Sequence, residues 1–150
     1  VLQVLKHFGQ CKLVDQNSEI GYNSIYSQKT ELKMTTLNYT VEQVKDIVAE
    51  AKAEARKAAD EFFQTKLNGQ DQYACGFAWV DIYGIKGNTK LGKVMKAAGI
   101  ERSDYKKCFS IWNPSEHGAQ NIDTKEAGAL AAQKVFEKYG FRAYAGSRLD

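Results

Sequence analysis

The chain has 150 residues, of which 43% are hydrophobic and 26% are charged. These proportions are those of an ordinary globular domain, and they exclude a disordered or fibrous protein. A net charge of +3 is too small to identify a nucleic-acid-binding protein by itself. No stretch has the length and apolarity of a membrane span or the pattern of a secretory signal, so we expect a cytoplasmic protein with no membrane partner.

The N-terminal part differs from the rest in composition. Residues 1–33 contain no alanine, whereas the remainder is rich in it, and the first methionine is Met34. This break predicts an N-terminal extension or a small separate element over 1–33, followed by a single globular domain over 34–150.

A long helix is expected over residues 40–66. Thr40 and Gln43 form a capping-box pattern at its start. Apolar residues, many of them alanine, then recur every three or four positions from Val41 to Phe62. Such a seam predicts close packing, either on the chain's own domain or in a homo-oligomer through Val41–Phe62.

Three strands and two further helices are expected after this helix. The strands are 73–84, 108–112 and 141–147, and the helices are a short one that Gly99 ends and a longer one that runs from Asp123 to Tyr139 and buries Leu130. This order predicts an α/β or α+β fold in which helices pack a small sheet of three or more strands. Alternation favours parallel strands, and an antiparallel sheet is the alternative.

The positive charge is concentrated between Gly84 and Lys107, where seven Lys or Arg residues stand against two acidic ones. Glycines before a helix N-terminus allow a phosphate to approach the backbone, although the spacing fits no named phosphate loop. We expect a contact with nucleic acid or a phosphorylated ligand, and lysines on the solvated face of a helix are the alternative. The candidate residues are Lys86, Gly87, Asn88, Thr89, Lys90, Lys93, Arg102, Lys106 and Lys107.

Aromatic residues form a second pattern. Phe77, Trp79 and Tyr83 share one face of a strand, and Trp112 and Tyr144 lie on segments expected to be neighbouring strands. If this face of the sheet is exposed, it could stack nucleic-acid bases as RRM-type sheets do. The alternative is that the long helix covers it and makes it core.

Polar residues follow each expected strand. Parallel strands would gather them at one edge, where open α/β sheets bind ligands. His117 with Glu116 is a candidate for acid–base catalysis, and the alternative is a surface turn with no catalytic role. The histidine and cysteine spacings fit no metal site, and we expect no cofactor. The residues expected at this edge are Asp81, Lys86, Asn113, Ser115, Glu116, His117, Ser147, Arg148 and Asp150.

Four segments carry a resemblance to other proteins: CGFAWV, WNPS, GAQNIDTKEAGALAA and YAGSRLD. Through them the chain from Cys75 to Asp150 resembles a group of small proteins of tailed bacteriophages, marine ones included. The resemblance implies a phage or prophage source and action inside an infected cell rather than in the virion. It transfers no activity and no residue role.

The sequence therefore predicts a cytoplasmic phage accessory protein, more in keeping with a binding protein than with an enzyme. It would contact nucleic acid or a phosphorylated ligand through the basic segment from Lys86 to Lys107. A small enzyme acting at the polar edge and an interaction protein that assembles through the long helix are the alternatives.

Overall fold

The computed structural model describes residues 37–150, and the expectations for residues 1–33 lie outside them. The elements in chain order are α2 (Val41–Lys66), β1 (Gly76–Tyr83), α3 (Lys90–Ala97), β2 (Glu101–Ser103), β3 (Cys108–Trp112), α4 (Ile122–Lys138) and β4 (Arg142–Leu149). Every helix and strand expected after residue 40 is present. The short strand β2 is an addition.

The four strands form one antiparallel sheet in the order β2-β3-β1-β4. The fold is therefore α+β, and the expectation of parallel neighbouring strands is wrong. The reason is β2, because its hairpin with β3 reverses the direction of the chain before β3 pairs with β1. From β1 onward, the order strand, helix, strand, strand, helix, strand is the split βαβ arrangement, to which α2 is added at the front.

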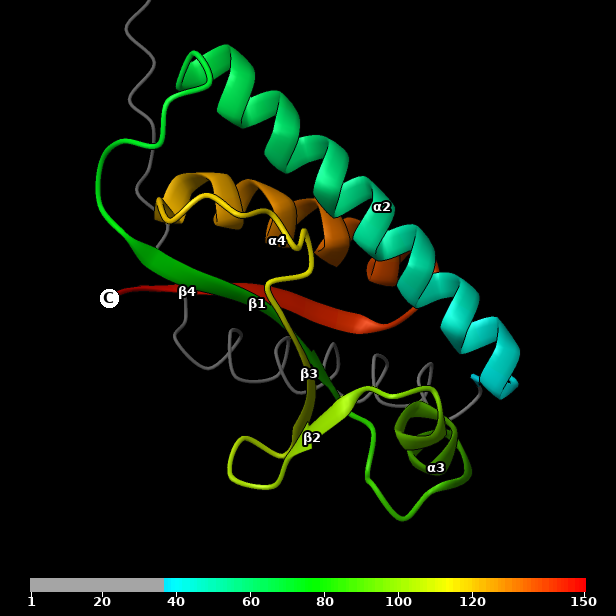
Figure 1. Cartoon of the computed structure of the whole chain (residues 1–150). Helices are drawn as coiled ribbons and strands as arrows, with labels where there is room; N and C mark the ends of the chain where they lie inside the picture. The colour runs from blue at the N-terminus through cyan, green and yellow to red at the C-terminus, as the bar shows by residue number, and fades with distance from the viewer. Residues whose placement is uncertain (1–36) are drawn as a thin grey trace, which may run out of the picture.

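Helices α2 and α4 lie side by side on the same side of the sheet (Figure 1). Ala78, Val80 and Ile82 of β1 are fully buried and belong to the same core as residues of both helices. Side chains alternate between the two faces of a strand, so Trp79 of β1 points to the opposite side. The long helix therefore does not cover the aromatic face, and that alternative is wrong.

The alanine-rich seam of α2 packs inside the domain. Val44, Ala51 and Ala55 are buried in the core. On α4, a Cβ added to Gly128 would lie 3.1 Å from the carbonyl oxygen of Ala55 and 2.7 Å from the Cβ of Ser115. Small residues on both helices thus allow close approach, which is one of the two roles expected for this seam.

Replacing Gly128 with alanine should lower the free energy of unfolding by about 1–3 kcal/mol, because the new methyl group overpacks the contact between the helices. Urea denaturation followed by circular dichroism measures the change. Gly118→Ala is the matched control, since a Cβ at Gly118 meets nothing within 4 Å. Equal midpoints for the two variants would contradict the packing argument.

The helix ends follow local signals in the sequence. Thr40 caps α2 in a complete capping box with Gln43, as expected. Gly99 and Gly140 have φ values of 88° and 86°, the left-handed conformation that ends a helix at glycine.

Helix α4 begins at Ile122, one residue before the expected start at Asp123, and its N-cap is Asn121. The side-chain oxygen of Asn121 accepts a hydrogen bond from the amide of Thr124. Asp71, in the loop between α2 and β1, holds Asn121 in place. Its carboxylate accepts hydrogen bonds from the Gln120 amide at 2.7 Å, the Asn121 amide at 3.0 Å and the Asn121 side chain at 2.9 Å. The cap therefore depends on a residue about 50 positions earlier in the chain.

Hydrogen bonds from the Asn121 side chain and the Gln120 amide hold the pKa of Asp71 below its usual value. A carboxylate whose pKa is lower in the folded than in the unfolded state stabilises the fold above the unfolded pKa, and this contribution is lost as the pH falls through the folded pKa.

Asp71→Asn should lower the urea midpoint at neutral pH, since one amide nitrogen would face the Gln120 N–H. The difference from the wild type should shrink below about pH 3.9. A variant of the exposed Asp46, Asp46→Asn, should match the wild type throughout; a pH-independent deficit in Asp71→Asn would oppose this account.

Candidate functional site

One side of the sheet carries most of the exposed aromatic residues of the strands. We call it the open face, because both long helices of the described residues lie on the other side (Figure 1). By strand alternation and register it consists of Phe77, Trp79, Asp81 and Tyr83 of β1, Cys108, Ser110 and Trp112 of β3, and Arg142, Tyr144, Gly146 and Arg148 of β4.

Two tryptophans dominate the open face. Trp79 and Trp112 are cross-strand partners, and their rings are parallel, with centroids 5.6 Å apart and an interplanar angle of 1°. Gly146, the partner of Trp79 on β4, makes room for the indole, since a Cβ there would lie 2.7 Å from its ring atoms. Trp112 is 55% exposed and Tyr144 is 49% exposed. These two side chains therefore offer ring surface to a ligand.

Four cations lie over aromatic rings of the open face. They come from the turn between β2 and β3, from the first turns of α4 and from β4. The pairs, with the distance from the charged group to the ring centroid, are Lys106–Trp79 (4.6 Å), Lys125–Phe77 (5.4 Å), Arg142–Tyr144 (5.8 Å) and Arg148–Phe77 (5.4 Å). The face thus combines ring surface with positive charge.

Asp81 lies at the centre of the open face and is 6% exposed. Its Oδ1 accepts a hydrogen bond from Ser110 Oγ at 2.7 Å, and its Oδ2 accepts from Trp79 Nε1 at 2.9 Å and Lys106 Nζ at 3.0 Å. Burial would raise the pKa of Asp81, but the bonds from Ser110, Lys106 and Trp79 outweigh it and hold the pKa below its usual value. The ionised carboxylate therefore fixes the Trp79 ring and the Lys106 ammonium in position.

The basic segment is divided between two places in the fold. Lys106, in the β2–β3 turn, belongs to the open face, whereas Lys90 at the start of α3 donates to Asn38 Oδ1 at 2.8 Å. Thr89 caps α3: its hydroxyl donates to the Lys86 carbonyl and accepts from the Gly92 amide. Asn88, Lys93 and Lys107 are exposed.

Two cations meet over the turn that precedes α3. A Cβ added to Gly87 would lie 2.8 Å from Arg102 Nε and 3.1 Å from Lys96 Nζ. Arg102 is held by the Ile85 carbonyl and by the ring of Phe109, and its side chain is 15% exposed. The turn thus brings the guanidinium of Arg102, which is held in place, close to the ammonium group of Lys96. A phosphate contact at this turn stays a prediction.

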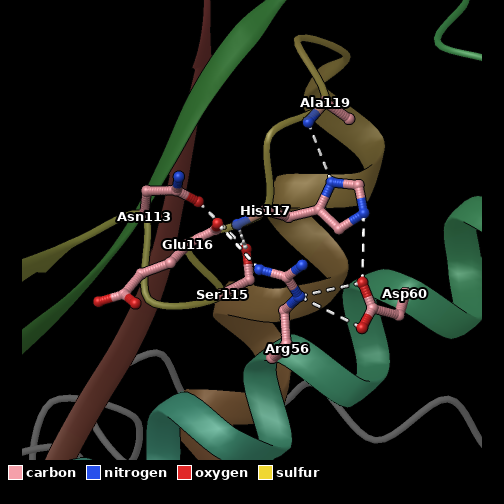
Figure 2. A network of polar contacts seen from close by, with 7 residues as sticks. All are labelled: Arg56, Asp60, Asn113, Ser115, Glu116, His117 and Ala119. Atoms are coloured by element: carbon pink, nitrogen blue, oxygen red, sulfur yellow. Dashed lines mark hydrogen bonds and ion pairs between the residues drawn. The ribbon is translucent and has the colours of Figure 1, made fainter.

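Figure 2 shows the network around His117, the residue expected to be the acid–base candidate. Its Nδ1 accepts a hydrogen bond from the Ala119 amide at 3.0 Å, and its Nε2 lies 3.3 Å from an Asp60 oxygen. The ring also packs on Phe63, with centroids 5.0 Å apart. Both ring nitrogens are engaged within the protein, an arrangement that fixes the β3–α4 loop on α2. A catalytic role for His117 stays a prediction that this geometry does not favour.

The other residues expected at the polar edge divide between the two sides of the sheet. Because β3 and β4 both run antiparallel to β1, the C-terminal ends of β3 and β4 lie at the same edge of the sheet. The C-terminal end of β1 lies at the opposite edge. The expected gathering is therefore wrong for Asp81 and Lys86. At the shared edge, Ser115 bonds Asn113, Glu116 pairs with Lys52, Ser147 bonds Glu126, Arg148 lies on the open face, and the Asp150 amide bonds the Cys75 carbonyl.

A shallow groove of about 540 Å³ runs between α2 and α4 on the outer side of the helix layer. Leu130, expected to be buried, is 48% exposed and lines this groove. Glu54 and Ala58 of α2 line it from the other side. A homo-oligomer through Val41–Phe62 stays a prediction.

Comparison with known proteins finds no matching family model, no matching curated protein and no matching solved structure. Within residues 37–150, no helix is both long and apolar enough to cross a membrane. In the same residues, no group of three or more His, Cys, Asp and Glu side chains is placed to hold a metal ion. The geometry of the open face is therefore the basis on which a function can be inferred.

Proposed function

We propose that the chain binds single-stranded nucleic acid on the open face and catalyses no reaction. The observation that carries the proposal is the parallel pair of Trp79 and Trp112 on a face where four cations lie over aromatic rings. Stacking of a base on an aromatic side chain contributes about 1–3 kcal/mol, and Lys or Arg residues neutralise the phosphates. Paired bases in a duplex cannot present their faces to these rings, so a single strand is the ligand that fits.

This proposal keeps the ligand class expected from the sequence and moves the main contact to the sheet. Lys106 belongs both to the basic segment and to the open face. Lys96 and Arg102, which meet over Gly87, would supply further phosphate contacts. With the resemblance to proteins of tailed phages, the proposal describes a phage accessory protein that acts on nucleic acid inside an infected cell.

The side chains with catalytic potential support a binding protein over an enzyme. Both nitrogens of His117 are engaged by neighbouring groups. On the open face, burial and the nearby Asp81 carboxylate raise the pKa of the Cys108 thiol, which disfavours the thiolate that a nucleophile requires. The Asp81 carboxylate accepts hydrogen bonds from three donors, which disfavours a role as a general base.

Fluorescence-anisotropy titration with a labelled single-stranded oligonucleotide at about 50 mM salt tests the proposal. We expect saturable binding that weakens as salt is added, and weaker binding of the corresponding duplex. Both tryptophans of the chain lie on the open face, so base stacking should also change the intrinsic tryptophan fluorescence. Absence of binding to single-stranded DNA and RNA at this salt concentration would reject the proposed function.

A further inference from the structure

A negative charge at the centre of a surface that binds a polyanion calls for an explanation. Asp81 occupies that place on the open face: Ser110 is its partner on β3, and Tyr144 is its partner on β4. The carboxylate is buried beneath Lys106 and accepts three hydrogen bonds, one on Oδ1 and two on Oδ2. The carboxylate holds the side chains of Trp79, Lys106 and Ser110 in position. It is also a hydrogen-bond acceptor on the open face that repels a phosphate, because both groups are negatively charged.

An ionised carboxylate has about four lone-pair positions and no proton to donate. Three of these positions are filled at Asp81 by Ser110, Trp79 and Lys106, and Ser110 is the one donor within hydrogen-bond distance of Oδ1. The Tyr83 hydroxyl and the Cys108 thiol also lie near the carboxylate, and burial together with this negative charge raises the pKa of both. A ligand group that donates a hydrogen bond can fill the remaining position. A ligand group that only accepts would face a buried charge with the wrong polarity, which costs binding free energy.

The ring surface lies within reach of this carboxylate. Tyr144 is directly across from Asp81, and Trp112 is diagonal to it, being paired with Trp79 two residues earlier on β1. Directly opposed side chains in a sheet are about 5 Å apart, and diagonal ones are about 7–8 Å apart. A base that stacks on Trp112 or Tyr144 and lies toward β1 therefore brings an edge to Asp81.

We propose, on the basis of the proposed function, that Asp81 makes the open face select bases that carry an exocyclic amino group, and in particular cytosine over thymine or uracil. Cytosine presents its N4 amino group as a donor, a contact that acidic side chains accept. Thymine and uracil present a carbonyl oxygen at that position, and their N3–H lies between two carbonyl oxygens that would face the carboxylate. The ligand class is thus a cytosine-containing single strand.

Oligonucleotides of about twelve residues, long enough for one domain of this size, test the inference by anisotropy at one salt concentration. The probes are oligo-5-methyldeoxycytidylate and oligothymidylate, which carry the same methyl group and the same number of phosphates. The wild-type protein should bind the methylcytosine strand at least about fivefold more tightly. Asp81→Asn should bind both strands with equal affinity, because an asparagine amide offers either a donor or an acceptor.

The matched control is Asp104→Asn, which removes the same charge from an exposed position in the nearby β2–β3 turn. Loss of a negative charge should raise the affinity for both strands equally, so this variant should keep the preference of the wild type. Equal affinities in the wild type overturn the inference, and this result needs no variant to fold. A preference that persists in a folded Asp81→Asn protein also overturns it. In either case tight binding of both strands would leave the proposed function standing, whereas failure of both strands to bind would reject the proposed function itself.

Discussion

Replacement of Trp112 by alanine should weaken single-strand binding by at least about tenfold, the lower part of the range measured when a base loses its aromatic stacking partner. The reason is exposure. Trp112 offers more than half of its surface to solvent, whereas Lys106 lies over the ring of Trp79. The first base to stack on the open face therefore meets Trp112. Anisotropy titrations of the variant and the wild type at the same salt concentration measure the loss.

The stability of this variant should change less than its affinity. Trp112 packs on Trp79 and Phe77, and an aromatic pair contributes about 0.5–1.5 kcal/mol beyond its buried area, so a small decrease in the urea midpoint is expected. Trp112→Phe should recover much of the affinity, because the phenyl ring can still stack. Tyr73→Ala is the control for removal of an exposed aromatic residue outside the sheet, and it should bind as the wild type does. If Trp112→Ala binds as tightly as the wild type, the open face is not the binding surface.

The helices and the longer strands could be predicted because their signals are local. The capping box of Thr40 and Gln43 and the stop at Gly99 each depend on residues within one or two turns. Strand β2 lacks such a signal, since Glu101–Ser103 is short and carries no alternation of apolar residues. If β2 is overlooked, β3 is predicted to run in the wrong direction relative to β1. This three-residue strand therefore decides between a parallel and an antiparallel sheet.

The buried side of α4 shows the limit of hydrophobic pattern. The sequence favours Leu130 as a core residue, yet Leu130 is half exposed, whereas Gly128, Ala129 and Ala132 are among the buried positions. Small residues are selected there because the backbone of α2, at Ala55, comes close to α4. Where two helices pack at short distance, a large apolar side chain is therefore a poor guide to the buried face of the helix. Only the tertiary arrangement identifies that face.

The candidate site was partly visible in the sequence. The aromatic residues of β1 share a face by simple alternation, and the tryptophan of β3 could be added to them. Arg142 and Gly146 were missed, although they alternate with Tyr144 along β4. Their roles depend on register, since it is the pairing of Trp79 with Gly146 that lets the indole lie against β4. Register could not be derived without knowing that β1 lies between β3 and β4.

Two sets of positive charges compete as the main phosphate contacts, and a pair of triple variants separates them. The first replaces Lys106, Arg142 and Arg148 of the open face with glutamine, and the second replaces Lys90, Lys93 and Lys96 of α3 with glutamine. Each removes three charges, so any difference between them reflects position and not net charge. Both should remain folded, because five of the six side chains are exposed, Arg142 is half-buried, and a glutamine at position 106 keeps a donor for the Asp81 carboxylate.

The open-face variant should lose about two units from the slope of log K against log salt, at about 0.7 for each phosphate contact with a single strand. At about 0.1 M salt this corresponds to a loss of affinity of about a hundredfold. The α3 variant should lose much less, because none of these three lysines is among the cations that lie over the rings of the open face and because Lys90 is engaged by Asn38. Titrations at several salt concentrations give both slopes directly. If the α3 variant shows the larger change, the strand is held by the basic segment before and along α3, and the aromatic face is a secondary contact.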